Sequence, residues 1–123
     1  MNRVSPNFTV KEFACKCGKC NYTTPSLALV AALEELREAL GNKPLRINSG
    51  LRCPAHNKAV GGSPNSQHVK GTAADVRPPK GMTSEQLAKT AENIKAFQEG
   101  GIGIYPTFVH LDVRGYKARW RGK

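Results

Sequence analysis

The sequence is poor in acidic side chains, in histidine and in long apolar runs. It has nine Asp and Glu residues against 19 Lys and Arg, a formal net charge of +10, three histidines and one tryptophan. No apolar stretch approaches the roughly 20 residues that span a membrane as a helix, which argues against a transmembrane segment. A surface of this charge attracts polyanions, such as nucleic acid or the anionic bacterial cell envelope.

Length and composition predict one folded domain over residues 1–123. Of the 123 residues, 39% are hydrophobic and 23% are charged, as in an ordinary globular domain with a single core. We expect a monomer. An irregular, cysteine-rich arm is predicted at residues 1–23, with Phe8 and Phe13 as its anchors, and a basic tail at residues 115–123.

Apolar periodicity and turn residues predict the secondary structure. Apolar residues recur at helical spacing after Ser26, and Gly41 stands where that helix would end. Thr83 or Ser84 can cap a second long helix that ends at residues 100–101. A turn of helix is predicted at residues 54–60, and strands at residues 45–48, 73–76, 102–105 and 108–113. This order predicts an α+β fold, with a small antiparallel sheet and helices packed on one face.

Three side chains form a candidate metal site. His68 and Asp75 are separated by a segment in which Gly71 lets the chain reverse, and His110 lies inside an apolar strand. Each of them alone would fit a hydrogen-bonded structural role. As a set, two imidazoles and one carboxylate are a usual group of ligands for catalytic zinc.

Such a ligand set indicates hydrolysis. It leaves one coordination position open for a water, whose pKa then falls to about 7, so that amides can be attacked at neutral pH. The same ligands could hold iron, but oxygenases with this iron site usually have larger barrels.

Asp112 and Arg52 are the candidate catalytic residues. Asp112 follows His110 by two positions in a strand, so both side chains leave the same face about 6–7 Å apart. It could act as general base and later as general acid, or it could orient His110 or pair with Arg114. Arg52 could grip a substrate carboxylate or stabilise an oxyanion, or form an ordinary surface salt bridge.

Four cysteines are divided between the arm and the neighbourhood of Arg52. Cys15, Cys17 and Cys20 lie in the arm and Cys53 follows Arg52 directly. Thiols that are free or partly bridged, disulfides and a structural metal site all remain open. In either bonded state the arm would be pinned to the loop that carries Arg52.

Several motifs follow one another along the chain. Their residues are Ser49-Gly50-Leu51-Arg52, Gly61-Gly62-Ser63, Ser66-Gln67-His68, Gly71-Thr72-Ala73-Ala74-Asp75, Gly101-Ile102-Gly103-Ile104-Tyr105 and Phe108-Val109-His110-Leu111-Asp112-Val113-Arg114. The pattern Ser-x-His-x-x-Gly-x-Ala-x-Asp is the most specific of them. Together they resemble the M15 family of zinc D-Ala-D-Ala carboxypeptidases and related endolysins, over about residues 7–114.

The resemblance implies a hedgehog/DD-peptidase-type α+β fold and one catalytic Zn²⁺. It also implies peptidoglycan stem peptides as the substrate. The residues that it implies are His68, Asp75 and His110 as zinc ligands, Arg52 as the substrate-gripping arginine, and Ser66 and Gln67 as residues that shape the pocket.

One departure from the family pattern concerns the acid/base. Some members carry an acidic residue or histidine two or three positions before the last zinc histidine, and Phe108 and Thr107 occupy those places here. The departure puts the role on Asp112. It also leaves a second hypothesis, a non-catalytic zinc-containing module that binds the wall or belongs to a phage particle.

The two ends of the chain give the remaining expectations. Residues 1–6 are not followed by the apolar run of about 7–15 residues that a signal peptide needs. For a wall substrate we therefore expect synthesis in the cytoplasm and release during phage or prophage lysis, or incorporation into a virion. The basic tail, with Tyr116 and Trp120 interleaved, could anchor the protein to the envelope or to nucleic acid, or be a solvated terminus. Nucleic-acid binding is disfavoured because no nucleic-acid-binding module is recognised.

Overall fold

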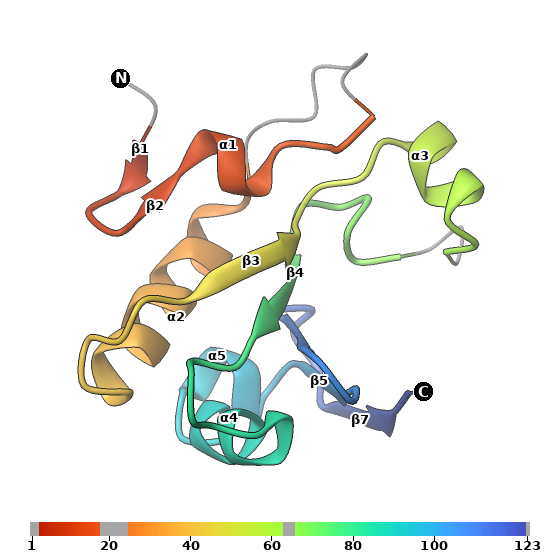
Figure 1. The fold of residues 1–123 in the computed structure, drawn as a ribbon. Coiled ribbons are helices and arrows are strands. Elements are labelled where there is room, and N and C mark those ends of the chain that lie inside the picture. Colours follow the sequence, from red (N-terminus) through yellow and green to blue (C-terminus); the bar gives the residue numbers. More distant parts are fainter. Residues whose placement is uncertain (1–2, 18–24, 63–65, 123) are drawn as a thin grey trace.

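A computed structural model describes residues 3–17, 25–62 and 66–122 (Figure 1). The elements in chain order are β1 (Arg3–Ser5), β2 (Phe8–Thr9), α1 (Val10–Phe13), α2 (Leu27–Ala39), β3 (Arg46–Ser49), α3 (Pro54–Ala59), β4 (Ala73–Arg77), α4 (Ser84–Ala91), α5 (Lys95–Gln98), β5 (Gly101–Ile104), β6 (Val109–Asp112) and β7 (Ala118–Arg121). The predicted α+β class is confirmed. None of the helices in these ranges is long and apolar enough to cross a membrane.

The main sheet is mixed, so the prediction of a purely antiparallel sheet is wrong. Its strand order is β3-β4-β6-β5-β7; the first four strands pair antiparallel, and β7 pairs parallel to β5 at the edge. After β6, which is antiparallel to β5, the chain crosses to the other edge of β5 and forms β7 there. Strand β7 can therefore run in the same direction as β5. The hypothesis of a solvated basic tail is therefore wrong for residues 118–121, which are part of the sheet.

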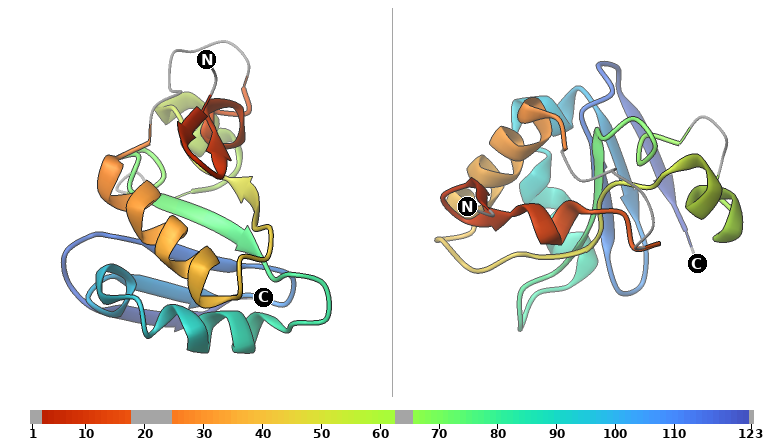
Figure 2. Two further views of the ribbon diagram at one scale, coloured as in Figure 1. Left: turned by 90° about the vertical axis from the view of Figure 1, so that its left-hand side faces the viewer. Right: turned by 90° about the horizontal axis from the view of Figure 1, so that it is seen from above.

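The two faces of this sheet differ in character. On β4 and β6, Ala74, Val76, Val109 and Leu111 are fully buried and belong to the hydrophobic core. Helices α4 and α5 pack on β5 and β6, and α2 packs on α4 and α5. Seen from above, the strands separate these three helices from α3 (Figure 2). Since side chains alternate along a strand, the residues between the core positions point to the opposite face.

Helix α2 begins and ends as the sequence predicts. The Ser26 hydroxyl accepts a hydrogen bond from the Leu29 amide at 3.0 Å, and Gly41 takes a positive φ of 76° beyond the last turn. Leu29, Leu33 and Leu36 are fully buried, each contributing about 1.5–3 kcal/mol by the removal of its side chain from water.

The second predicted helix is two helices. Thr83 caps α4 through a capping box with Gln86, but the chain turns at residues 92–94, where Ile94 is extended, before α5 begins. Phe97 on α5 is fully buried in the core. A single continuous helix over this stretch is therefore wrong.

The amino-terminal arm is more regular than predicted. Its described residues 3–17 contain the β1–β2 pair and α1, which Thr9 and Glu12 cap reciprocally. Phe8 and Phe13 are fully buried with ring centroids 5.9 Å apart, so their predicted anchoring role is confirmed. The Leu51 amide donates to the Phe13 carbonyl at 2.8 Å, which joins the arm to the loop after β3.

Candidate active site

Residues from four strands form one row across the face opposite the helices. Asp75 on β4 lies opposite His110 on β6. His110 in turn lies opposite Gly103 on β5, and Gly103 lies opposite Trp120 on β7. Directly opposed residues project from the same face of a sheet. The row therefore places the Asp75, His110 and Trp120 side chains side by side.

A tight turn brings His68 to the same place. The Ser66 hydroxyl accepts a hydrogen bond from the His68 amide at 3.1 Å. Gly71, with a positive φ of 76°, then reverses the chain into β4, which the sequence predicted. His68 and His110 are both buried, and their rings meet edge to face with centroids 5.1 Å apart.

The three predicted ligands converge at the spacing of a metal site. His68 Nε2 and His110 Nδ1 each lie 3.2 Å from Asp75 Oδ1, and all three ligand atoms lie within 4.8 Å of one another. Zinc bonds to nitrogen and oxygen of about 2.0–2.2 Å imply tetrahedral edges of about 3.3–3.6 Å. The donor set and its spacing therefore fit a zinc ion.

The other nitrogen of each imidazole is held by the protein. His68 Nδ1 lies 2.6 Å from the Gly50 carbonyl oxygen, and His110 Nε2 lies 2.7 Å from Asp112 Oδ2. Each ring donates from that remote nitrogen and turns its other nitrogen toward Asp75. Such contacts fix the tautomer and orientation that a metal ligand needs.

The electrostatics of the centre are those of a cation site. Burial favours the neutral acid, but hydrogen bonds from His110 and His68 outweigh it and hold the pKa of the Asp75 carboxyl well below its usual range. Burial likewise opposes the charged form of His110, yet hydrogen bonds to Asp112 and Asp75 raise its pKa above the ordinary value. Without a metal, positive charge on His110 offsets the negative charge of the carboxylate.

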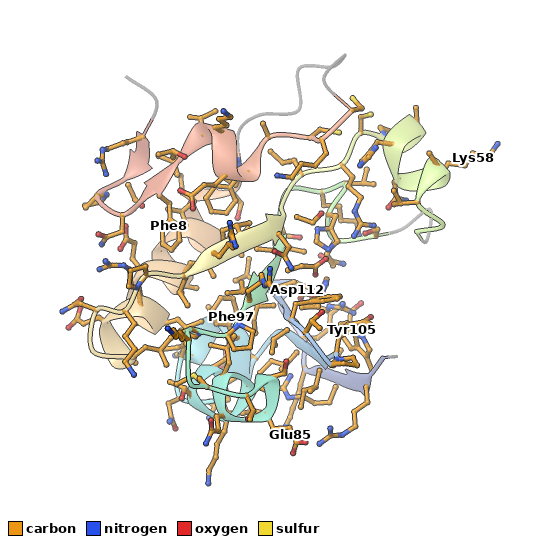
Figure 3. The ribbon with its side chains drawn as sticks, viewed as in Figure 1. Phe8, Lys58, Glu85, Phe97, Tyr105 and Asp112 are labelled. Atoms are coloured by element: carbon orange, nitrogen blue, oxygen red, sulfur yellow. The ribbon has the colours of Figure 1, made fainter. Side chains whose placement is uncertain are left out.

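Asp112 does not occupy the position of a general base. It is 0% exposed and lies inside the domain (Figure 3). Its Oδ1 accepts from the Gly101 amide and from the Arg114 amide and Nε, and its Oδ2 contacts His110 Nε2 and Arg114 Nη2, both at 2.7 Å. It touches the far nitrogen of His110, across the ring from Asp75. Of the roles left open by the sequence, the contacts match both alternatives to the general base: it orients His110 and pairs with Arg114.

The predicted pocket residues are gathered around the ligands. Arg52 Nη2 lies 3.7 Å from Asp75 Oδ2, and its Nη1 donates to Asn57 Oδ1 at 3.0 Å. Ser66 and Gln67 line the same cleft, whose volume is about 530 Å³. Gln67 Oε1 accepts a hydrogen bond from the Thr72 hydroxyl at 2.8 Å, which fixes its orientation.

Sequence reasoning missed the aromatic wall of this cleft. Tyr105 and Phe108 stack with centroids 4.4 Å apart, and Trp120 lies 5.0 Å from the His110 ring and donates to the Tyr105 hydroxyl. The available signal was the glycine alternation in β5. A Cβ on Gly103 would overlap the Trp120 ring, so glycine is required for the tryptophan to reach His110.

The cysteines form a second cluster outside the cleft. The sulfur atoms of Cys15, Cys17 and Cys53 lie within 4.8 Å of one another, so the arm lies beside the Arg52 loop at this point, and the bonding state of the cysteines stays a prediction. Cys20 lies outside the described residues.

Comparisons with known proteins agree with this site. The sequence matches the family described as Peptidase M15 over residues 6–112. The zinc D-Ala-D-Ala carboxypeptidase of Streptomyces albus G is 32% identical over 76 residues, which are 62% of this chain and 28% of that protein. The probable peptidoglycan L,D-endopeptidase MepK of Haemophilus influenzae is 31% identical over 90 residues, which are 68% of this chain and 46% of that protein.

The chain therefore spans less than half the length of either relative, 28% and 46%. The family match runs from residue 6 to residue 112, so it contains Arg52 and the three candidate metal ligands, whereas Arg114 lies two residues beyond it. The chain belongs to the peptidase M15 family.

Proposed function

We propose that this chain is a zinc-dependent peptidase that hydrolyses amide bonds in the stem peptides of peptidoglycan. The observation that carries the proposal is the convergence of two imidazoles on one carboxylate oxygen, each at 3.2 Å, beside a cleft of about 530 Å³. The substrate class is supported by the names of the two relatives, one a D-Ala-D-Ala carboxypeptidase and the other a probable peptidoglycan endopeptidase.

Zinc held by His68, Asp75 and His110 would polarise the scissile carbonyl and acidify a water. The protein's own contribution begins with Arg52. Its guanidinium is anchored by Asn57 and faces the cleft beside Asp75, so that it can bind an anionic oxygen of the substrate, either a carboxylate or the developing oxyanion.

Asp112 and Arg114 serve as positioning residues in this account. Asp112 holds the His110 ring from behind, and Arg114 holds Asp112 through Nε and Nη2. The stacked Tyr105 and Phe108 and the Trp120 ring offer an apolar wall to a stem-peptide side chain, which keeps water away from one side of the reacting bond.

A digestion experiment tests the proposal. Purified protein with zinc should release new amino termini from muropeptides, and His110→Ala should abolish the release. His56→Ala is the matched control, because His56 lies on α3 and is not among the residues of the cleft. Mass spectrometry of the products separates loss of a terminal D-Ala from cleavage inside the peptide. No turnover by the zinc-loaded wild type would contradict the proposal.

One observation favours a second candidate, a non-catalytic zinc-containing module that binds the wall. Among the described residues of the cleft, Asp75 is the only carboxylate, and Asp112 has both oxygens occupied. An acid/base separate from the ligands is therefore missing from that set. Retention on insoluble peptidoglycan by a zinc-loaded protein that releases no products would support this candidate over the peptidase.

We propose a hedgehog/DD-peptidase-type fold, supported by the helical layer on one face of the sheet and the site on the other. We propose action on the cell wall as a phage or prophage endolysin, supported by the net charge of +10, which suits an anionic envelope.

A further inference from the structure

We propose that Cys15, Cys17 and Cys53 hold a second metal ion, a structural zinc that pins the arm to the Arg52 loop. Their three sulfur atoms lie within 4.8 Å of one another, so they converge on one point between two segments that are far apart in sequence. Cys17 Sγ and Cys53 Sγ are 3.8 Å apart. Zinc–sulfur bonds of about 2.3 Å give a tetrahedral edge of about 3.8 Å.

A metal explains this arrangement better than a disulfide. A disulfide has a sulfur–sulfur bond of about 2.05 Å and joins two cysteines, so no single bridge would use all three of the sulfur atoms that converge among the described residues. A metal uses all three. Zinc binding needs no oxidant, because each thiol releases a proton to solvent and becomes a thiolate ligand.

Backbone amides around the cluster suit thiolates. The Cys53 amide donates to Cys15 Sγ at 3.3 Å, and the His56 amide donates to Cys53 Sγ at 3.4 Å. Donors aimed at the sulfurs stabilise their negative charge and orient them, as the groups around metal ligands commonly do. The three described cysteines supply three of the four positions that structural zinc usually fills, and the proposal needs no other residue of this chain.

The position of the cluster gives the metal a use. The segment at residues 50–53 is already held on two sides: the Leu51 amide donates to Phe13, and the Arg52 amide donates to the His68 carbonyl at 3.2 Å. A metal bound by Cys53 would add a third attachment for the segment at residues 50–53. It would thereby limit the motion of Arg52 relative to His68, a consequence that rests on the proposed function.

Zinc content measured under reducing conditions tests the inference. We expect about two zinc ions per wild-type chain, about one in His68→Ala/His110→Ala, and about one in Cys15→Ser/Cys53→Ser. Cobalt added to the His68→Ala/His110→Ala protein should give the near-ultraviolet absorption of sulfur-to-cobalt charge transfer, which imidazole and carboxylate ligands do not produce.

A second readout does not depend on the folding of a cysteine variant. In the His68→Ala/His110→Ala protein, zinc should slow the alkylation of Cys15 and Cys53, and a chelator should restore the rate and lower Tm. The inference is overturned if that protein retains no zinc and its thiols alkylate equally fast with and without the metal, or if peptide mapping finds Cys17 and Cys53 in a disulfide in the freshly purified protein. Failure of muropeptide cleavage alone would reject the peptidase and leave this result standing.

Discussion

Neutralising Asp112 should lower the zinc affinity of the site, although Asp112 is not itself one of the proposed ligands. In Asp112→Asn the amide nitrogen can replace only one oxygen, and Oδ1 already accepts three hydrogen bonds, from Gly101 and twice from Arg114. The amide group would therefore take the Oδ2 side, where His110 Nε2 and Arg114 Nη2 both lie at 2.7 Å. His110 Nε2 and Arg114 Nη2, which are both donors, would then face the NH₂ group of the asparagine in place of an acceptor oxygen.

The contacts give the size of the effect. Leaving one buried donor without an acceptor costs about 1–3 kcal/mol, and breaking a buried ion pair costs about 3–5 kcal/mol. The Arg114 side chain is 17% exposed, so water relieves part of the loss, and we expect a destabilisation of about 2–4 kcal/mol. At roughly 4 °C per kcal/mol for a domain of this size, Tm should fall by roughly 8–16 °C.

Zinc affinity should fall about 10–100-fold in the same variant, because His110 loses the partner that fixes its tautomer. Chelator-competition titration and thermal unfolding measure the two effects. The exposed Glu38→Gln on α2 is the control for loss of one negative charge. If zinc affinity and Tm stayed unchanged while kcat fell about 10²–10⁴-fold, Asp112 would be the general base and our assignment would be refuted.

Three further predictions follow from the strands around the site. Gly103→Ala should displace Trp120 from His110, seen as a changed tryptophan emission and a higher KM for muropeptides; unchanged emission would contradict the packing. Hydrogen bonds from Arg119 lower the pKa of Glu92 below 4.5 despite burial, so the pair stabilises β7 above pH 4.5 and is lost as the pH falls through the lowered value. The protection of the β7 amides relative to their intrinsic exchange rates should fall there in the wild type, and in Glu92→Gln it should be low on both sides of that pH. The pKa of His110 is raised, so protons compete with zinc for this side chain. Zinc affinity should therefore weaken as the pH falls from about 8 to 6, whereas the metal-free protein gains stability from protonation of His110 over the same range. A zinc affinity that does not change with pH would contradict this competition.

The convergence of the three candidate ligands could be predicted because strand alternation and glycine placement are local properties. His110 stands between Val109 and Leu111, which are both buried in the core, so its side chain has to leave on the opposite face. Gly71 provides the reversal that returns the chain to Asp75. These relations need no knowledge of distant packing.

The role of Asp112 could not be read in the same way. Its spacing from His110 places both side chains on one face, but the side-chain torsions of His110 decide which ring nitrogen meets which carboxylate. Gly101 was the missing signal: a Cβ there would overlap the Asp112 carboxylate, so the space beside Gly101 is where that carboxylate has to lie.

Strand β7 was missed for a different reason. Its sequence, Ala-Arg-Trp-Arg, has little apolar surface, and its stability depends on tertiary contacts. Arg119 binds the Glu92 carboxylate and the Gly100 carbonyl, and Trp120 fills the space above Gly103. Such pairing emerges only once β5 and α4 are in place.

Anomalous diffraction at the zinc edge from zinc-loaded crystals would locate the ion and its ligands. We expect a peak about 2.0–2.2 Å from His68 Nε2, Asp75 Oδ1 and His110 Nδ1, with Asp112 still bound to His110 Nε2. A peak bonded to His110 Nε2 in place of Asp112, or no peak among these three side chains, would contradict it.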